Sequence, residues 1–196
     1  MRIIAGKFRS RRLRSMPGLE IRPTSDRLRE TLFDVLTAGN PGALEGSVWL
    51  DLYAGTGTVG IEAVSRGAAM VYFVESSRRA AEIIHRNLGE LGIESGVRVW
   101  LHDANAALRE LDGKLAEVDF IFLDPPYRVR DAYRGTLSRL SELPLSKTAV
   151  VIAEHEKRFE LGEKFGRLEK ARTLEQGDAA LSFYRVEGIL EKPALG

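Results

Sequence analysis

The chain has 196 residues, of which 44% are hydrophobic, and its formal net charge is +1. This length suits one domain with a short appendage, and the composition excludes a disordered chain. The absence of cysteine excludes disulfides and thiolate metal sites. No apolar run reaches the roughly 20 residues of a membrane span, and the N-terminus lacks the apolar core of a secretory signal. We therefore expect a cytoplasmic, monomeric protein that makes no membrane contact.

Positive charge gathers at the N-terminus, where the first 30 residues hold nine basic and three acidic side chains. We divide the chain into a basic arm, residues 1–24, and a body, residues 25–190. A basic arm on a nearly neutral body indicates a polyanion partner. A solvated surface or a disordered tail would have the same composition, although the interleaved Ile3, Phe8 and Leu13 could hold the arm to the body as short strands. The candidate polyanion contacts are Lys7, Arg9, Arg11, Arg12 and Arg22.

The body alternates strand and helix patterns. Helical spacing begins at Thr24, and each later apolar run is followed by another helical pattern or, at the end, by a hairpin. Strands that are apolar on both faces and alternate with helices predict a parallel sheet covered on both sides, which is a doubly wound α/β fold. The predicted strands cover residues 48–53, 70–75, 97–101, 118–123 and 149–153, and the hairpin covers residues 167–186.

The first strand ends in a turn rich in glycine, from Asp51 to Gly60. In open α/β sheets, ligands bind beyond the carboxyl ends of the strands, and Gly55 and Gly57 let the backbone approach a ligand closely. With Gly60, these glycines also match the G-x-G-x-x-G spacing of dinucleotide binders, so a nicotinamide enzyme stays open. Asp51 argues against it, because this position is usually apolar in dinucleotide binders, whereas a carboxylate here could hold the ammonium group of S-adenosylmethionine.

Acidic residues also end the next two strands. Glu75 can accept both hydroxyl groups of a ribose, which is common to both cofactors. Asp103 can accept a hydrogen bond from the adenine amino group, or it can cap the helix that follows, and the two roles are compatible. These residues, with Tyr53, Ala54 and Ala104 beside them, complete the predicted cofactor site.

The fourth strand ends in the most specific motif of the chain, Asp124, Pro125, Pro126 and Tyr127. Two prolines fix φ and remove two amide donors, so we expect their carbonyl groups to point into the site instead of closing a turn. The Asp124 carboxylate and the Pro125 carbonyl would accept hydrogen bonds from an exocyclic base amine and turn its lone pair toward a methyl sulfonium. Tyr127 offers an aromatic face for stacking a base. The chemistry predicted is methyl transfer to nitrogen, driven by positioning and electrostatics.

The three histidines have no spacing typical of metal ligands, so we expect no metal site. His155 lies between Glu154 and Glu156, a run that we interpret as a solvated loop after the fifth strand.

With both motifs in place, the sequence resembles the RsmD family, the bacterial 16S rRNA guanine-N2 methyltransferases. The resemblance implies a Rossmann-like class I methyltransferase fold with seven strands, the terminal one antiparallel. It also implies S-adenosylmethionine as cofactor, a guanine of 16S rRNA in the small ribosomal subunit as target, and an arm that contacts RNA. The segments that carry it are 2–8, 11–13, 21–24, 26–30, 50–57, 60–63, 65–68 and 122–127.

Besides the nicotinamide enzyme, two alternatives remain at this stage. The motif at Asp124 is shared with adenine-N6 methyltransferases that act on DNA or RNA. A non-catalytic RNA-binding assembly factor could keep the same fold, although the intact motif speaks against it.

Overall fold

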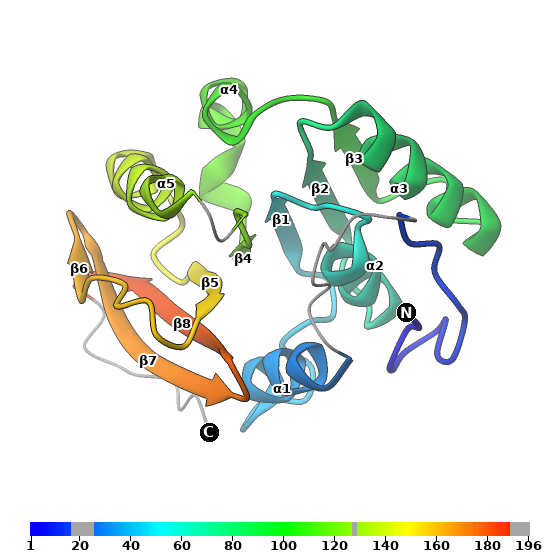
Figure 1. Ribbon diagram of the computed structural model, residues 1–196, viewed down its shortest axis with the longest axis horizontal. Helices are drawn as coiled ribbons and strands as arrows, with labels where there is room; N and C mark the ends of the chain where they lie inside the picture. Colours follow the sequence, from blue (N-terminus) through cyan, green and yellow to red (C-terminus); the bar gives the residue numbers. More distant parts are fainter. Residues whose placement is uncertain (17–25, 127–128, 189–196) are drawn as a thin grey trace.

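The computed structural model describes residues 1–16, 26–126 and 129–188 (Figure 1). Its helices are α1 (Asp26–Thr37), α2 (Thr58–Ser65), α3 (Arg78–Leu91), α4 (Ala104–Glu110), the 3₁₀ helix η1 (Asp112–Glu117) and α5 (Arg130–Glu142). Its strands are β1 (Val48–Leu52), β2 (Met70–Val74), β3 (Val97–Trp100), β4 (Phe120–Leu123), β5 (Val150–Glu156), β6 (Lys164–Phe165), β7 (Leu168–Gln176) and β8 (Ala179–Val186).

All the strands form one sheet with the order β3-β2-β1-β4-β5-β8-β7-β6. The strands β1 to β5 pair in parallel, and β8 pairs antiparallel with β5. The predicted hairpin is therefore present as β7 and β8, but the sheet has eight strands instead of seven, because the two-residue β6 adds to its edge. The strand order reverses between β1 and β4, which is where α/β sheets bind ligands.

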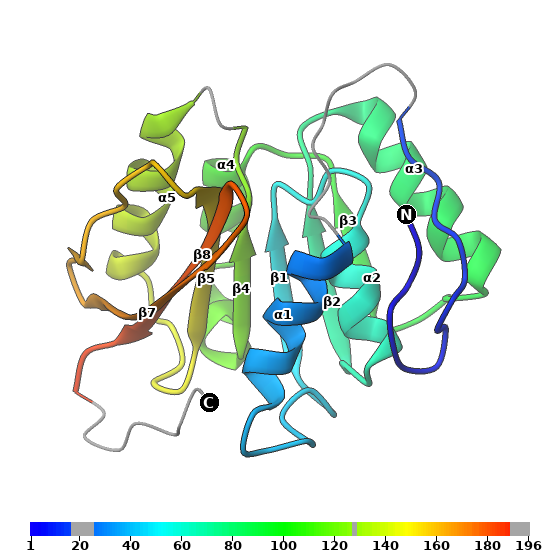
Figure 2. The ribbon, with the colours of Figure 1, turned by 60° about the horizontal axis from the view of Figure 1, so that its bottom comes forward.

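Helices cover both faces of the sheet, as the apolar strands predicted (Figure 2). The helices α1, α2 and α3 share a hydrophobic core with one face, in which Trp49 is fully buried and its ring lies 5.4 Å from Phe33 and 4.7 Å from Phe120. The helices α4, η1 and α5 share a second core with the other face. Because side chains alternate along a strand, these two cores show toward which face each residue points.

The run around His155 is not a solvated loop, and that interpretation was wrong. It continues β5, which pairs with β8 over its whole length, and both Glu154 and His155 are buried. The His155 ring lies 2.8 Å from the Ser182 hydroxyl through Nε2 and 2.8 Å from the Glu156 carbonyl through Nδ1. His155 is therefore part of the protein interior. Among the described residues, no group of His, Asp and Glu side chains could hold a metal ion.

The described part of the arm, residues 1–16, packs along α2 and α3 (Figure 2). Ile3 and Leu13 are buried, and a backbone bridge joins Arg2 to Arg12. The interleaved apolar residues thus hold residues 1–16 to the body, although this part of the arm forms an isolated bridge and not the short strands that we considered. In the part of the chain that the structure describes, no helix is both long and apolar enough to cross a membrane.

Candidate active site

The two predicted motifs lie side by side at the point where the strand order reverses. β1 and β4 are neighbours, and Leu52 at the end of β1 is in register with Leu123 at the end of β4. The glycine turn leaves β1 and the Asp124 motif leaves β4 at the same edge of the sheet (Figure 1). The geometry therefore brings the glycine turn next to Asp124.

The glycine turn depends on left-handed backbone conformations. Tyr53, Gly55 and Gly57 have φ angles of 64°, 57° and 80°. A side chain at Gly55 would meet nothing within 4 Å, so the turn is open at this residue. Gly60, in the first turn of α2, has the opposite surroundings, because a Cβ there would lie 2.3 Å from Cε1 of Phe73. Gly60 is required for packing α2 against the sheet, and Gly55 leaves room for a ligand.

Two carboxylates hold this turn through backbone amides. Asp51 Oδ2 accepts a hydrogen bond from the Gly60 amide at 3.0 Å. Glu75, just after β2, accepts from the Gly55 amide at 2.8 Å and from the Ser77 amide at 2.7 Å. Both side chains thus order the loop, and Glu75 is only partly buried whereas Asp51 is buried.

The site concentrates negative charge in a poorly solvated place. Burial, and then the nearby Glu75 carboxylate, raise the pKa of Asp51 to about 7, although the Gly60 amide opposes this shift. Burial, followed by repulsion from Glu154 and Asp51, raises the pKa of Asp124 well above its ordinary value. Carboxyl groups that destabilise one another in this way favour a cationic ligand.

Asp103 performs the capping role that the sequence allowed. Its Oδ1 accepts a hydrogen bond from the Ala106 amide at 2.9 Å, at the start of α4. Asp103 is also exposed and close enough to Tyr53 to raise the pKa of that phenol, after the larger effect of burial. The Tyr53 hydroxyl lies 2.8 Å from the Thr136 hydroxyl, which links the glycine turn to α5. A ligand contact at Asp103 is compatible with its role as a cap.

The sequence predicted that the carbonyl groups of both prolines point into the site instead of closing a turn, and the structure differs from this prediction. The Pro125 carbonyl accepts a hydrogen bond from the Tyr133 hydroxyl at 3.1 Å, and the Pro126 carbonyl accepts one from the Val129 amide at 2.8 Å. The Pro126 carbonyl thus closes a turn, contrary to the prediction. The Pro125 carbonyl is oriented by α5 and keeps one lone pair. Tyr127 lies outside the described residues.

A further carboxylate, Glu154, belongs to this region and was missed by the sequence analysis. Ala153 is in register with Leu123, so Asp124, directly after β4, lies beside Glu154, which is within β5. Because side chains alternate along β5, the Glu154 side chain points to the sheet face that carries Ile152. The signal available was an acidic residue directly after an apolar run, the same signal that found Glu75 and Asp124.

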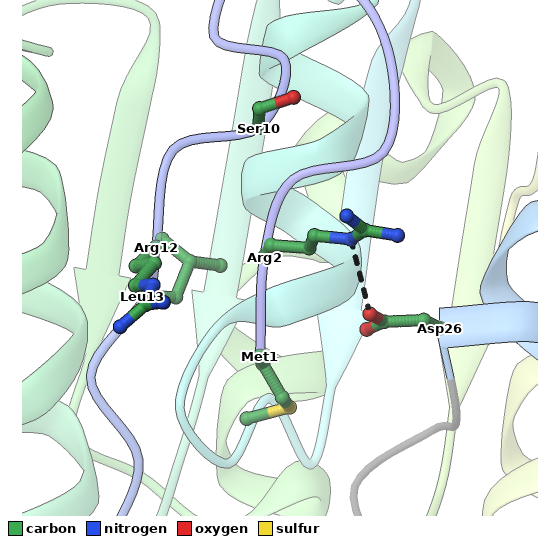
Figure 3. Close-up of a pocket in the computed structure, with 6 residues that line it drawn as sticks. All are labelled: Met1, Arg2, Ser10, Arg12, Leu13 and Asp26. Atoms are coloured by element: carbon green, nitrogen blue, oxygen red, sulfur yellow. Dashed lines mark ion pairs between the residues drawn. The ribbon is translucent and has the colours of Figure 1, made fainter.

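The predicted polyanion contacts lie on the arm, apart from the strand ends. Lys7, Arg9, Arg11 and Arg12 are exposed, and Arg11 donates to the Glu90 carbonyl at 3.1 Å. Arg12 lines a hollow of about 480 Å³ together with Met1, Arg2, Ser10, Leu13 and Asp26 (Figure 3). Arg2 forms an ion pair with Asp26 at 3.7 Å there. Arg22 lies outside the described residues.

Comparison with known proteins identifies the family. A family model described as "Conserved hypothetical protein 95" matches residues 1–185. The putative rRNA methyltransferase YlbH of Bacillus subtilis is 32% identical over 189 residues, which cover 96% of this chain and all of the relative. The ribosomal RNA small subunit methyltransferase D of Haemophilus influenzae is 32% identical over 157 residues, which cover 80% and 79% of the two chains. The chain belongs to the RsmD family.

Solved structures similar to this RsmD-family chain support the same assignment. The putative methyltransferase yhhF of Escherichia coli superposes with a TM-score of 0.79 at 28% identity, over 96% of this chain and 99% of that one. The putative methylase HI0767 of Haemophilus influenzae gives 0.75 at 29% identity, over 94% and 97%. The fold is therefore the Rossmann-like fold of methyltransferases, as the sequence predicted.

Proposed function

We propose that this chain transfers a methyl group from S-adenosylmethionine to the exocyclic N2 of a guanine in the RNA of the small ribosomal subunit. The observation that carries this proposal is the Asp124 carboxylate at the end of β4, directly beside the glycine turn that leaves β1. The RsmD-family relatives are named as rRNA or small-subunit rRNA methyltransferases, which supports the RNA class of the substrate.

The residues of the glycine turn fit the cofactor. S-adenosylmethionine carries a sulfonium and an ammonium group. Their positive charge would stabilise the ionised carboxylates of Asp51 and Glu75, which repel each other in its absence. The open space at Gly55 admits the adenosyl group close to the backbone. An RNA methyltransferase of Salinibacter ruber, which shares the fold with a TM-score of 0.61 at 20% identity, was solved in complex with S-adenosyl-L-homocysteine.

We assign to Asp124 the role of binding the base amine. Its carboxylate would accept a hydrogen bond from the amine and turn the nitrogen lone pair toward the methyl group. Positive charge moves from sulfur to nitrogen during the transfer, and a fixed carboxylate stabilises the nitrogen side. Tyr133 fixes the orientation of the Pro125 carbonyl, whose remaining lone pair can accept the second amine proton. Bound S-adenosylmethionine supplies the electrophilic methyl group.

The arm is the proposed contact to RNA outside the active site. Arg9, Arg11 and Arg12 are exposed on a backbone that buried residues hold in place, so their positive charge is presented without a large ordering cost. We further propose that the chain acts in the cytoplasm as a monomer, on the small subunit or its assembly intermediate.

The test is methyl transfer from radiolabelled S-adenosylmethionine to three substrates in parallel: small ribosomal subunits, free 16S rRNA and duplex DNA. We expect label in ribosomal RNA, released on digestion as N2-methylguanosine. Label found only in DNA, or only as N6-methyladenine, would replace this proposal with the adenine-N6 alternative. Asp124→Ala should reduce turnover by at least about two orders of magnitude while the Kd for the cofactor changes little, because the carboxylate acts on the amine.

A further inference from the structure

The helix α5 contacts both loops of the candidate active site through one face. The Tyr53 hydroxyl, in the glycine turn after β1, lies 2.8 Å from the Thr136 hydroxyl. The Tyr133 hydroxyl donates to the Pro125 carbonyl, in the motif after β4, at 3.1 Å. Tyr133 and Thr136 are three residues apart in α5, so they lie on the same side of the helix. One helix face therefore contacts the glycine turn and the Asp124 motif.

The part of α5 that makes these contacts is firmly packed. Tyr133 is 1% exposed and Thr136 is 2% exposed. Leu137 and Leu140, farther along the helix, are fully buried in the core that α5 shares with the sheet. A side chain in a close-packed core cannot shift without displacing its neighbours. The helix can thus hold the two loops at a fixed distance from each other.

The Thr136 hydroxyl makes its hydrogen bond outside its own helix. Buried hydroxyl groups need a hydrogen-bond partner, and serine and threonine in a helix commonly find one in a carbonyl of the preceding turn. Ser141, which is also buried in α5, does so by donating to the Ser138 carbonyl at 2.6 Å. Thr136 instead contacts Tyr53 in a loop far away along the chain. This contact therefore serves the loop and not the helix.

Tyr53 has a backbone conformation that needs support. Its φ of 64° lies in the left-handed region, which is unfavourable for a residue with a side chain. Such a conformation persists where surrounding contacts hold it, and it is common at functional sites. The supporting contacts include the Thr136 hydroxyl and the neighbouring Ala54 amide, which donates to the Val74 carbonyl at 2.9 Å. The turn is thus held by the sheet on one side and by α5 on the other.

The Asp124 motif is closed onto the start of the same helix. The Val129 amide, at the N-cap of α5, donates to the Pro126 carbonyl at 2.8 Å. One turn later, the Tyr133 hydroxyl returns to the Pro125 carbonyl. A displacement of the first turn of α5 would therefore move the Pro125 carbonyl and, with it, the adjoining Asp124.

We infer that Tyr133 and Thr136 are positioning residues, which make α5 the spacer that sets the distance between a methyl sulfonium at the glycine turn and a base amine at Asp124. The inference rests on the proposed function for the identity of these two groups. Direct transfer needs the reacting atoms in line and about 3–3.5 Å apart, so a misplacement of about 1 Å slows it strongly. The connection between the loops rests on the two hydrogen bonds and on the burial of both side chains.

Each end of the spacer can be released by removing one hydroxyl group. Thr136→Val and Tyr53→Phe each remove the contact with the glycine turn, and Tyr133→Phe removes the contact with Pro125. We expect kcat with small ribosomal subunits to fall by about ten-fold or more in each variant. The KM for the subunits and the Kd for S-adenosylmethionine should stay within about three-fold of the wild-type values, because the loss falls on the transfer step.

The matched control is Ser141→Ala, which also removes a buried hydroxyl group from α5, but one that binds within the helix. Its kcat should equal that of the wild type. The stoichiometry of S-adenosylmethionine binding in calorimetry gives the folded fraction of each preparation, so poor folding is not mistaken for slow transfer. A Kd that rises while kcat at saturating cofactor is unchanged would overturn the inference.

A double-mutant cycle compares the two ends of the spacer. Tyr53→Phe and Tyr133→Phe remove contacts with different loops, so independent effects on kcat would multiply. If α5 sets the distance, releasing one end already loses it, and the double variant should be no more than about two-fold slower than the slower single variant. A kcat that falls by the product of the two single effects would contradict the role of α5 as spacer.

An NMR experiment tests the same connection without RNA or cofactor. The ¹H–¹⁵N signal of Val129 reports on the motif loop, because its amide donates to the Pro126 carbonyl. Tyr53→Phe should shift this signal, and Ser141→Ala should leave it in place. A Val129 signal that does not move in Tyr53→Phe would refute the connection. Absence of methyl transfer to any RNA by the wild type would instead refute the proposed function, and the NMR signal would still decide whether α5 connects the loops.

Discussion

Asp51 is a carboxylate that folding places where its ionised form is poorly solvated. It is 2% exposed, and burial and Glu75 raise its pKa to about 7 from an unfolded value of 3.8. A carboxyl group with a raised pKa stabilises the folded state below the unfolded pKa, and this contribution is lost as the pH rises through the folded pKa. Because of Asp51, the free energy of unfolding should therefore fall progressively as the pH rises from about 4 to about 7.

Asp51→Asn tests this linkage. Without the ionisable group, the variant should unfold with a higher free energy than the wild type at pH 8, by up to about 4 kcal/mol, and the difference should vanish near pH 4. The asparagine oxygen can still accept the Gly60 amide, so the turn keeps its hydrogen bond. Urea unfolding of both proteins at several pH values measures this. A constant difference at all pH values would contradict the assigned cause.

The same substitution should weaken binding of the proposed cofactor. The neutral asparagine would no longer offset the positive charge of S-adenosylmethionine, so calorimetry at pH 8 should show a Kd raised by about ten-fold or more. If the variant is more stable but binds the cofactor less well, the Asp51 carboxylate lowers the free energy of unfolding in the free protein and raises the affinity for the cofactor. Unchanged affinity would mean that Asp51 only orders the turn.

Residues at strand ends could be predicted from the sequence because an acidic side chain directly after an apolar run is unusual. That signal placed Glu75 and Asp124 at the carboxyl end of the sheet, whereas Asp51 was found from its place four residues before the first glycine of the turn. It failed at Glu154, because the charged run after Ala153 is typical of a loop. Only the pairing of β5 with β8 buries this run, and that contact joins residues far apart in the chain. The use of the Pro125 carbonyl by Tyr133 likewise depends on where α5 packs.

At the scale of elements, α2 packs on β2 through a position that admits no side chain. A Cβ at Gly60 would lie 2.3 Å from Cε1 and 2.8 Å from Cζ of Phe73, and 2.9 Å from Cγ1 of Val71. Phe73 and Val71 are fully buried, so neither can move into solvent. The helix and the glycine turn before it therefore share one set of tight contacts.

Gly60→Ala should destabilise the protein by about 1–3 kcal/mol through overpacking, although alanine favours a helix. Gly135→Ala in α5 is the matched control, because a Cβ there meets nothing within 4 Å. The control should be neutral or more stable by up to about 1 kcal/mol. Chemical denaturation of the three proteins compares them. Equal effects at both positions would show that packing at Gly60 is not the determinant.

A buried carboxylate joins the arm to the body, beside further hydrogen bonds from the arm to Ser65 and Asn87. Glu62 in α2 accepts hydrogen bonds from the Ile4 and Ala5 amides at 2.8 and 3.0 Å and from Arg66 Nε at 2.8 Å. Arg29 Nε lies 3.7 Å from it, and both charged side chains are fully buried. Removing this carboxylate breaks the buried ion pair and leaves Arg29 with the partly exposed Asp26 as its counter-charge.

Glu62→Gln should therefore cost about 3–5 kcal/mol of folding free energy and release the arm. Limited trypsin digestion should cut the variant within residues 1–16 faster than the wild type. Glu90→Gln is the control, since the Arg14–Glu90 pair is exposed and is worth about 1 kcal/mol or less. If Glu90→Gln frees the arm as readily as Glu62→Gln, the buried carboxylate is not the anchor.

The order of elements could be predicted more fully than their ends. Apolar runs bounded by glycine and separated by helical spacing indicated the parallel strands and the hairpin of residues 167–186. The short β6 was not predictable, because two residues carry no periodicity and pair only once β7 is in place. The doubly wound arrangement followed from general rules for parallel sheets, not from any particular residue, and the strand order itself was not predicted.

In the whole molecule, the exposed positive charge of the arm and the candidate active site lie in different places. The acidic strand ends form the candidate active site, and the exposed cations of the arm lie beside α2 and α3 (Figure 2). An RNA that reaches the candidate active site while it contacts the cations of the arm must extend over the surface between them. Such an arrangement gives affinity to the arm and specificity to the strand ends, because phosphate contacts carry no sequence information.

Replacing Arg9, Arg11 and Arg12 with alanine should weaken RNA binding and lower its dependence on salt. Removing one phosphate contact should reduce the slope of log K against log[salt] by about 0.7–0.9, so the triple variant should show a slope smaller by roughly two. Turnover at saturating RNA should be nearly unchanged, because none of these side chains lines the strand ends.

A control with Arg139, Lys157 and Lys164 replaced removes equal charge from α5, the loop after β5 and β6. Filter binding over a range of salt concentrations measures both slopes. Should the control flatten the slope as much as the arm variant does, RNA binding would follow net charge and the arm would not be the contact surface.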